Sequence, residues 1–264
     1  MATYLDRILA AHRAAAERDA RPLDDLVEAA LAQPPARPFA AALTADDGLA
    51  VVAEVKRRSP SKGDLAPDLV AAAVARAYAA GGAACLSVLT DHEFFGGSPA
   101  DLADARAAVG LPVLRKDFTV SERDVCDTRL MGADAVLLIA AALDDAELGH
   151  LHQLALDVGL APLVEAHDEA ELERALAVGA ALVGVNQRDL VTFEVDAGRA
   201  ARLAKLVPDG VVKVAESGVG ERRDAESLWD AGYDAVLVGE SLVTAADPAA
   251  ALRQLRPTGR GLGE

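Results

Sequence analysis

Four acid and base side chains stand at the ends of three short apolar runs in this sequence. Glu54 and Lys56 end one run, Lys116 ends a second, and Glu165 ends a third. Residues two apart on an extended strand point to the same side, so Glu54 and Lys56 are expected to face one space. One such pair is equally compatible with a buried ion pair, but four groups converging from three strands indicate proton transfer.

Lysine is rare in this chain, which makes each lysine position informative. The 26 basic residues comprise five lysines and 21 arginines. Arginine stays charged at any working pH, whereas lysine can gain and lose a proton. Arg115 precedes Lys116 and, being adjacent on a strand, is expected to point the other way. Apolar neighbours and this second cation predict that the pKa of Lys116 is lowered into the range used for proton transfer.

Two glycine-rich segments after the last two apolar runs have the form of a phosphate-binding turn. They are Ser217-Gly218-Val219-Gly220 and Gly239-Glu240-Ser241. Backbone N–H groups and a helix N-terminus bind phosphate where glycine allows close approach. Either segment alone is equally compatible with a plain tight turn, so the pair is the stronger sign. Lys56 and Arg188 are the expected sources of positive charge beside the phosphate.

The elements that must position these residues alternate regularly from residue 49 onward. Eight short apolar runs suit strands buried on both faces. They span 49–55, 85–89, 112–114, 135–139, 161–164, 182–185, 211–215 and 235–238. Apolar residues recur at helical spacing between them, as in 68–80, 122–131, 144–158, 168–178 and 222–231. This order predicts an α/β protein, a (β/α)8 TIM barrel whose active site lies at the C-terminal ends of the strands.

A weak internal repeat supports the barrel. Met131-Gly132-Ala133-Asp134-Ala135-Val136 and Ala231-Gly232-Tyr233-Asp234-Ala235-Val236 each end a helix on glycine and enter the next strand. The structural alternative is a doubly wound open sheet. However, no G-x-G-x-x-G follows the first run, and six strands would suffice for that fold.

The two ends of the chain differ from its centre. The first 48 residues have no predicted strand and are expected to form an N-terminal helical extension (1–48) packed on the barrel, with helices over roughly 4–19 and 23–33. The barrel is predicted over 49–256. The tail over 257–264 contains three glycines and is expected to be flexible.

Composition excludes several classes of protein. The 26 basic and 42 acidic residues give a formal charge of −16, and 52% of residues are hydrophobic. The chain is therefore too apolar for disorder and too acidic for electrostatic binding to nucleic acid or an anionic membrane. It lacks both an apolar run of ~18 residues and the apolar core of a secretion signal. Two cysteines in predicted elements, Cys85 and Cys126, indicate a cytoplasmic protein without disulfides, and no obligate protein partner is predicted.

Six segments, taken in order and spacing, resemble the indole-3-glycerol-phosphate synthase family. Between residues 50 and 245 they read E-V-K-R-R-S-P-S, L-T-D-H-E-F-F-G-G-S, L-R-K-D-F, L-V-E-A-H, G-V-N-Q-R-D-L and A-E-S-G-V. The resemblance implies a lyase of tryptophan biosynthesis. Its phosphorylated substrate is 1-(2-carboxyphenylamino)-1-deoxyribulose 5-phosphate, and its products are indole-3-glycerol phosphate, carbon dioxide and water. It implies no metal and no organic cofactor.

The resemblance also implies roles for the polar residues. Lys116 corresponds to the acid that protonates a ketone oxygen while the aromatic carbon attacks. Lys56 and Glu165 match the later loss of carboxylate and the dehydration. The assisting and positioning catalytic residues are Glu54, Asn186, Glu216 and Ser217.

Substrate contacts follow from the same resemblance. The apolar wall for the aromatic ring is expected from Phe95, Phe118 and Ile139. The other substrate-binding residues are Ser59, Arg188, Gly218 and Gly239. Glu240 departs from the family, which often has serine at this position beside the phosphate. Because an inward carboxylate would repel that ligand, its side chain is expected to face solvent.

Two other functions stay open at the level of sequence. A different phosphate-binding barrel, such as a Schiff-base aldolase, would use Lys116 as a nucleophile, and borohydride trapping of an adduct would favour it. A catalytically inactive barrel that serves as a binding subunit is the second, although all matched polar positions are present. The sequence does not decide the oligomeric state or which lysine serves each proton-transfer step.

Overall fold

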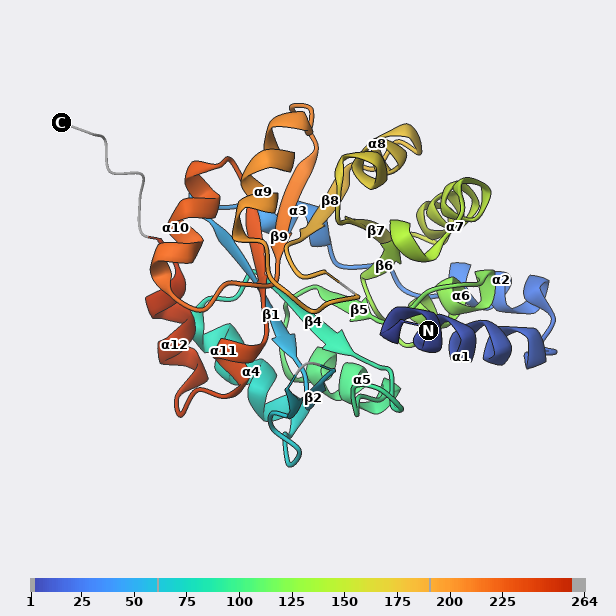
Figure 1. The fold of residues 1–264 in the computed structure, drawn as a ribbon. Coiled ribbons are helices and arrows are strands. Elements are labelled where there is room, and N and C mark those ends of the chain that lie inside the picture. The colour runs from blue at the N-terminus through green and yellow to red at the C-terminus, as the bar shows by residue number, and fades with distance from the viewer. Residues whose placement is uncertain (1–2, 61, 190, 258–264) are drawn as a thin grey trace.

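Eight parallel strands close into a barrel, in the order β1-β4-β5-β6-β7-β8-β9-β10, with β10 pairing back onto β1 (Figure 1). The computed structural model describes residues 3–60, 62–189 and 191–257. The barrel strands are β1 (Ala50–Val55), β4 (Cys85–Leu89), β5 (Val113–Lys116), β6 (Ala135–Ile139), β7 (Ala161–Ala166), β8 (Leu182–Asn186), β9 (Val212–Glu216) and β10 (Ala235–Val238). The (β/α)8 barrel predicted from the sequence is confirmed.

Helices follow the strands and surround the barrel. They are α4 (Ala71–Gly81), α5 (Pro99–Ala108), α6 (Glu122–Leu130), α7 (Asp145–Asp157), α8 (Glu169–Ala177), α9 (Ala197–Leu203), α10 (Arg222–Asp230), α11 (Glu240–Val243) and α12 (Pro248–Leu255), with short 3-10 turns η1 (Ala140–Ala142) and η2 (Ala204–Leu206). Among the described residues, no helix has both the length and the apolar content to cross a membrane.

The internal repeat marks equivalent helix-to-strand junctions. Gly132 and Gly232 follow α6 and α10 with φ of 87° and 93°, a left-handed conformation that glycine adopts without steric cost. Two residues later, the carboxylates of Asp134 and Asp234 accept hydrogen bonds from the backbone N–H groups of Val113 and Lys213, each at 2.8 Å. The repeated aspartate therefore fastens the start of one strand to the start of its neighbour.

Several strands are longer than their apolar runs predicted. β5 extends to Lys116, β7 extends past Glu165, and β8 and β9 end at Asn186 and Glu216. Apolar content alone ends the predicted strands too early, because these polar side chains point into the barrel from regular strand positions. On β5 and β7, an apolar residue stands two positions earlier on the same inward face, as Leu114 does for Lys116.

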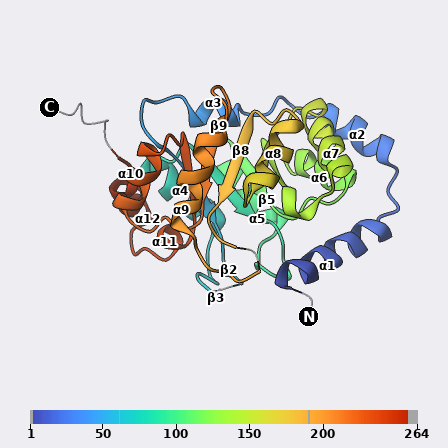
Figure 2. The same ribbon diagram turned by 45° about the horizontal axis from the view of Figure 1, so that its top comes forward.

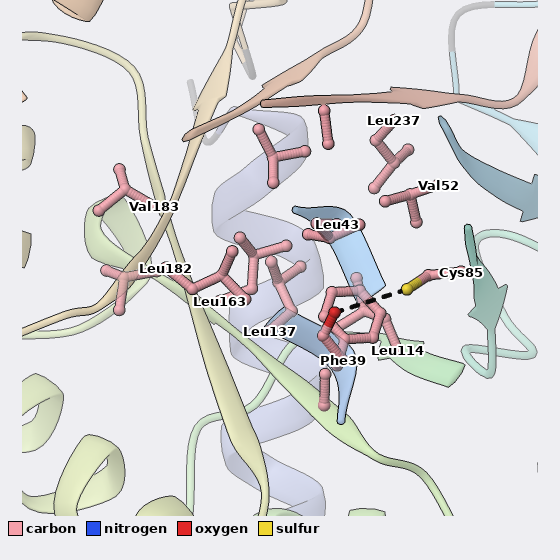
Figure 3. Close-up of a cluster of buried hydrophobic side chains, with 14 of the residues drawn as sticks. Phe39, Leu43, Val52, Cys85, Leu114, Leu137, Leu163, Leu182, Val183 and Leu237 are labelled. Atoms are coloured by element: carbon pink, nitrogen blue, oxygen red, sulfur yellow. Dashed lines mark hydrogen bonds between the residues drawn. The ribbon is translucent and has the colours of Figure 1, made fainter. Parts of the chain in front are cut away.

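Those earlier positions form the apolar core of the barrel. Figure 3 shows Val52, Leu114, Leu137, Leu163 and Leu237 from five different strands pointing toward one shared cluster. Each is at most 5% exposed. The polar side chains at the C-terminal ends of the strands lie on this packed apolar layer. We call them the polar layer: Glu54, Lys116, Glu165, Asn186 and Glu216. The interior of the barrel is therefore filled with side chains rather than open.

The N-terminal region contributes three helices, two of which lie at opposite ends of the barrel. They are α1 (Tyr4–Arg18), α2 (Leu23–Leu31) and α3 (Phe39–Leu43), the last of which the sequence pattern did not predict. Figure 2 shows α1 and α3 at opposite ends of the barrel. Phe39 and Leu43 are each 1% exposed within the core cluster, and the Cys85 thiol lies 3.7 Å from the Phe39 carbonyl oxygen (Figure 3).

Polar contacts fasten α1 to the barrel at the end opposite α3, above the C-terminal ends of the strands. The Nε2 atom of His12 lies 3.0 Å from Asp91 Oδ2, and Arg13 pairs with Glu147 at 2.7 Å. The division into an extension, a barrel and a tail stays a prediction. Residues 258–264 of the predicted flexible tail lie outside the described residues.

The loop after β1 contains a small element that the sequence pattern missed. β2 (Arg58–Ser59) and β3 (Gly63–Asp64) pair antiparallel as a two-stranded ribbon. Two-residue strands carry too little alternation to be read from sequence. The ribbon brings Ser59 and Lys62 to the rim of the barrel mouth, where both line the central cavity.

Candidate functional site

A cavity of about 590 Å³ lies at the C-terminal ends of the barrel strands. All the residues predicted for the site from the sequence line it. They are Glu54, Lys56, Ser59, Phe95, Lys116, Phe118, Ile139, Glu165, Asn186, Arg188, Glu216, Ser217, Gly218 and Gly239. The fold brings them together because polar strand ends and the following loops share one face of a parallel barrel.

Lys116 occupies the centre of the polar layer. Its Nζ atom donates a hydrogen bond to Glu165 Oε2 at 2.9 Å and lies 3.2 Å from Glu216 Oε2. The side chains of both glutamates are at most 2% exposed, and that of Lys116 is 15% exposed. One ammonium group is thus held between two buried carboxyl groups from β7 and β9.

The prediction that the pKa of Lys116 is lowered is wrong. Burial favours the neutral amine, but Glu165, Glu216 and Glu54 outweigh burial and hold the pKa of Lys116 above its usual value. The expected lowering by Arg115 does not occur, because Arg115 points away and donates hydrogen bonds to Thr90, Thr128 and Asp117. In this state Lys116 is a charged ammonium group, which carries a proton that it can donate.

The two glutamates beside Lys116 differ in their surroundings. Burial opposes ionisation of Glu165, but Lys116 and His167 outweigh burial and lower its pKa. Burial raises the pKa of Glu216; the Lys116 ammonium lowers it, but burial and the neighbouring Glu165 carboxylate together outweigh Lys116. Glu216 Oε1 lacks a hydrogen-bond partner among the described residues, and the raised pKa favours the protonated carboxyl group.

Gly184 on β8 makes room for this cluster, a feature that the sequence reasoning missed. A Cβ atom at Gly184 would overlap Glu216 Oε1. The glycine interrupts an otherwise apolar strand, and glycine within a strand can mark a close approach of another group. That signal was present in the sequence.

Glu165 has further partners on its second oxygen. Oε1 accepts a hydrogen bond from Asn186 Nδ2 at 3.1 Å and lies 3.3 Å from His167 Nε2. Asn186 is in turn held by the backbone N–H of Arg188, which donates to Asn186 Oδ1 at 3.0 Å. These contacts fix the direction of the Glu165 carboxylate. The sequence motif included His167, but no role was assigned to it.

Glu54 and Lys56 form a second ion pair in the cavity, with 2.5 Å between Lys56 Nζ and Glu54 Oε1. Gly239, which follows β10, lies next to them. A Cβ atom there would overlap Glu54 Oε1 and lie 3.1 Å from Lys56 Nζ. The absence of a side chain at Gly239 therefore leaves space for the ion pair.

The apolar wall of the cavity includes residues from the N-terminal helix. Phe95 and Phe118 lie with ring centroids 6.1 Å apart beside Ile139. Three residues of α1 complete this wall and were not predicted from the sequence: Tyr4, Leu5 and Ile8. They sit on an ordinary amphipathic helix, so their sequence carries no sign that they face a cavity rather than the core.

The loop after β9 has an unusual backbone. Ser217 has φ of 66° and Gly218 has φ of 74°, so two consecutive residues adopt the left-handed conformation. This conformation is uncommon for serine and marks a constrained turn. The Gly218 position is also crowded, since a Cβ atom there would lie 2.7 Å from Val195 Cγ1.

Glu240 lies at the rim of the cavity and is partly exposed, with its carboxylate paired to the Lys62 ammonium. The expectation that it faces open solvent is therefore only partly met. Its charge is balanced by Lys62 from the loop after β1. Residue 61 of that loop lies outside the described residues.

Comparison with known proteins decides the family. The family model described as indole-3-glycerol phosphate synthase matches residues 5–255, which covers every barrel strand and all of α1 except its first residue. The chain belongs to the indole-3-glycerol phosphate synthase family. This confirms the family, and with it the class of enzyme, that the six sequence segments predicted.

Individual members of the family are similar along most of their length. The chain is 51% identical to indole-3-glycerol phosphate synthase of Streptomyces griseus over 259 residues, covering 97% of this chain and 96% of the relative. It is 57% identical to that of a Nocardioides species over 208 residues, or 79% and 80% of the two chains. The Polaromonas protein is 47% identical over 260 residues, covering 97% of this chain and 98% of the relative.

The solved structures include one with a similar fold and little sequence similarity. Thiamine phosphate pyrophosphorylase from Pyrococcus furiosus matches with a TM-score of 0.60 and 17% identity, over 78% of this chain and 93% of that one. This likeness shows the barrel fold alone. Membership of the indole-3-glycerol phosphate synthase family is established by the sequence matches alone.

Proposed function

We propose that this cavity binds 1-(2-carboxyphenylamino)-1-deoxyribulose 5-phosphate and converts it to indole-3-glycerol phosphate, carbon dioxide and water. The observation that carries the proposal is the charged Lys116 ammonium group, held by Glu165 and Glu216 at the centre of the polar layer. Ring closure needs an acid at this place, because the ketone oxygen gains negative charge as the aromatic carbon attacks.

Lys116 supplies the first proton in this proposal. The bond between the aromatic carbon and the ketone carbon forms while the ketone oxygen takes a proton from Lys116 Nζ. Loss of carbon dioxide then restores the aromatic ring. In the dehydration, the new hydroxyl group takes a proton from an acid and leaves as water, while the carbon between the nitrogen and the former ketone carbon loses a proton to a base. Because the substrate carboxylate departs as neutral carbon dioxide, each turnover takes up one proton from solvent. The site must therefore both donate and recover protons.

Lys56 and the glutamates serve the later steps. The Lys56 ammonium stabilises the substrate carboxylate until that group leaves, and Glu54 holds Lys56 at 2.5 Å. Glu165 is the base of the dehydration, since its pKa is lowered and it is ionised at neutral pH. Asn186, Glu216 and Ser217 position these groups.

The remaining contacts orient the substrate. Phe95, Phe118 and Ile139 pack against its aromatic ring, while the backbone at Gly218 and Gly239 approaches its phosphate. Further substrate contacts come from Ser59 and Arg188. The polar layer lies between these two regions of the cavity, so a substrate that spans them presents its reacting carbons to Lys116.

The charge state of Lys116 disfavours a Schiff-base aldolase. A Schiff base forms by attack of a neutral amine on a carbonyl, whereas two glutamates keep the Lys116 amine protonated. Borohydride reduction in the presence of substrate is expected to leave Lys116 unmodified. We place the protein in the cytoplasm and expect it to act without an obligate protein partner, metal or organic cofactor.

The direct test is turnover by the purified protein. Incubation with the anthranilate-derived substrate is expected to produce an indole-fluorescent product and carbon dioxide in equal amounts. A metal chelator should leave the rate unchanged. Absence of indole product from the folded protein would refute the proposed function.

A further inference from the structure

His167 is a buried histidine in direct contact with the site, and the mechanism above gives it no role. Its side chain is 11% exposed and follows β7 directly. The imidazole ring lies between two carboxylates, that of Glu165 inside the barrel and that of Glu171 on α8.

The start of α8 fixes the orientation of this ring. Asp168 caps the helix by accepting from the Glu171 N–H, which brings Glu171 back toward His167. Glu171 Oε2 then accepts from both the backbone N–H of His167 at 2.8 Å and its Nδ1 at 2.9 Å. With Nδ1 committed to Glu171, the other ring nitrogen, Nε2, lies 3.3 Å from Glu165 Oε1, within ion-pair distance, and makes no hydrogen bond to the described residues.

The two carboxylates make the imidazole a cation. Burial lowers the pKa of His167, but the contacts to Glu165 and Glu171 outweigh burial and raise that pKa to about 10. The charges around the polar layer then balance when Glu216 carries a proton. Three cations face three carboxylates: Lys56, Lys116 and His167 against Glu54, Glu165 and Glu171.

This second cation matters at one point of the reaction. Glu165 depends on Lys116 for its low pKa, yet Lys116 loses its positive charge when it protonates the ketone oxygen. A lone buried glutamate would then tend to take up a proton and could no longer act as a base. His167 contacts the other oxygen of Glu165 and keeps its charge through that step.

We propose that His167, oriented by Glu171, is a positioning residue that keeps Glu165 ionised and directed at the substrate while Lys116 is deprotonated. The proposal rests on the proposed function, in which Glu165 is the base of the dehydration. It assigns a purpose to the L-V-E-A-H segment beyond its glutamate.

The test compares pH profiles of kcat for wild type, His167→Gln and Glu171→Gln. Glutamine at 167 keeps a hydrogen-bond donor near Glu165 but removes the charge. An opposite charge within a few Å lowers a carboxyl pKa by about 1–3 units, so His167→Gln should move the acidic limb of kcat upward by that amount. Glu171→Gln should move it in the same direction by less, since the ring remains in place.

His150→Gln is the matched control. His150 also contacts a glutamate, Glu122 at 2.8 Å, but its side chain is 61% exposed and remote from the cavity lining. Its pH profile should superimpose on that of wild type. A purely structural role for His167 would lower kcat at every pH without moving the limb, and that result would overturn the proposal.

Two further measurements keep the outcomes separable. In wild type labelled with ¹⁵N-histidine, the His167 ring should carry protons on both nitrogens at pH 7.5, and a neutral ring would overturn the proposal even if the variants fail to fold. Glu165→Gln tests the underlying function. If that variant keeps wild-type turnover, the role of Glu165 fails; if it loses turnover while His167→Gln keeps the wild-type profile, only the role of His167 fails.

Discussion

Replacing Lys116 by methionine should change both the rate and the stability of the protein, and the stability change should depend on pH. The variant keeps most of the length of the side chain and removes its charge. Loss of the proton donor should lower kcat by ~10²-fold or more, with substrate affinity within roughly tenfold of wild type. Lys116→Arg should fail equally, because arginine does not release its proton.

The size of the stability change follows from the two contacts of Lys116. At an effective dielectric constant of ~20, the attraction between Lys116 and Glu165 across 2.9 Å is about 6 kcal/mol before desolvation is counted, whereas the contact with Glu216 at 3.2 Å involves a carboxyl group that favours its protonated form. Removing one partner of a buried ion pair costs about 3–5 kcal/mol net. Glu216 already favours its protonated form, so the cost of the substitution falls on Glu165.

Glu165 can reduce this cost by taking up a proton. Protonating a carboxyl of ordinary pKa 4.5 costs about 2 kcal/mol at pH 6 and about 5 kcal/mol at pH 8, at 1.36 kcal/mol per unit. In the variant, the folded-state pKa of Glu165 lies above its unfolded value. The free energy of unfolding of the variant, relative to that of wild type, is therefore higher at pH 6 and falls as the pH rises to 8.

Urea unfolding of the Lys116→Met variant at pH 6 and pH 8 measures this difference. We expect a loss of about 2 kcal/mol at pH 6 and about 3–5 kcal/mol at pH 8. The double variant Lys116→Met/Glu165→Gln should recover most of it at pH 8. Lys205→Met, at an exposed lysine, is the control and should change little. Equal stability of wild type and Lys116→Met at both pH values would refute the buried ion-pair cluster.

Three more predictions test other parts of the site. Glu165→Gln should lose kcat by ~10²-fold in steady-state kinetics, because the amide cannot exchange a proton; a variant that loses thermal stability in calorimetry but keeps the wild-type rate would make Glu165 a structural partner only. Gly218→Ala places a Cβ atom on a residue in the left-handed conformation, 2.7 Å from Val195 Cγ1. Phosphate and product analogues should then bind more weakly in titration calorimetry, while the circular-dichroism spectrum stays normal. Unchanged affinity would place the phosphate elsewhere. Burial lowers the pKa of His12, but its contact with Asp91 outweighs burial and raises that pKa. The wild type should therefore have a larger free energy of unfolding than His12→Gln, with the full difference below pH 6.5 and none once the pH has risen through the raised pKa. A difference independent of pH would refute that contact.

The order of the elements and the members of the site are carried by local sequence. Apolar runs of strand length alternate with amphipathic helices, and chain connectivity then requires the ends of all parallel strands to meet on one face. Glu54, Lys116, Glu165 and Glu216 could be grouped for that reason alone. Short elements without periodicity, such as α3 and the β2–β3 ribbon, carry too few residues for such a signal.

The contacts within the site are decided by the tertiary structure. Lys116 is on β5, while Glu165 and Glu216 are on β7 and β9, strands that do not pair with β5. Their side chains meet only across the interior of the closed barrel. Local sequence therefore suggested that Arg115 would lower the pKa of Lys116, whereas the closed barrel surrounds Lys116 with carboxylates that raise it.

The same reason applies to the wall that α1 provides and to the partners of His167. Tyr4 and Phe95 are distant in the chain, and nothing local indicates that one cavity contains both. The sequence determined which residues carry charge and on which end of the barrel they stand. Only the three-dimensional packing decided which charges lie within 3–4 Å of one another, and electrostatic energy falls with that distance, so it also decided their protonation.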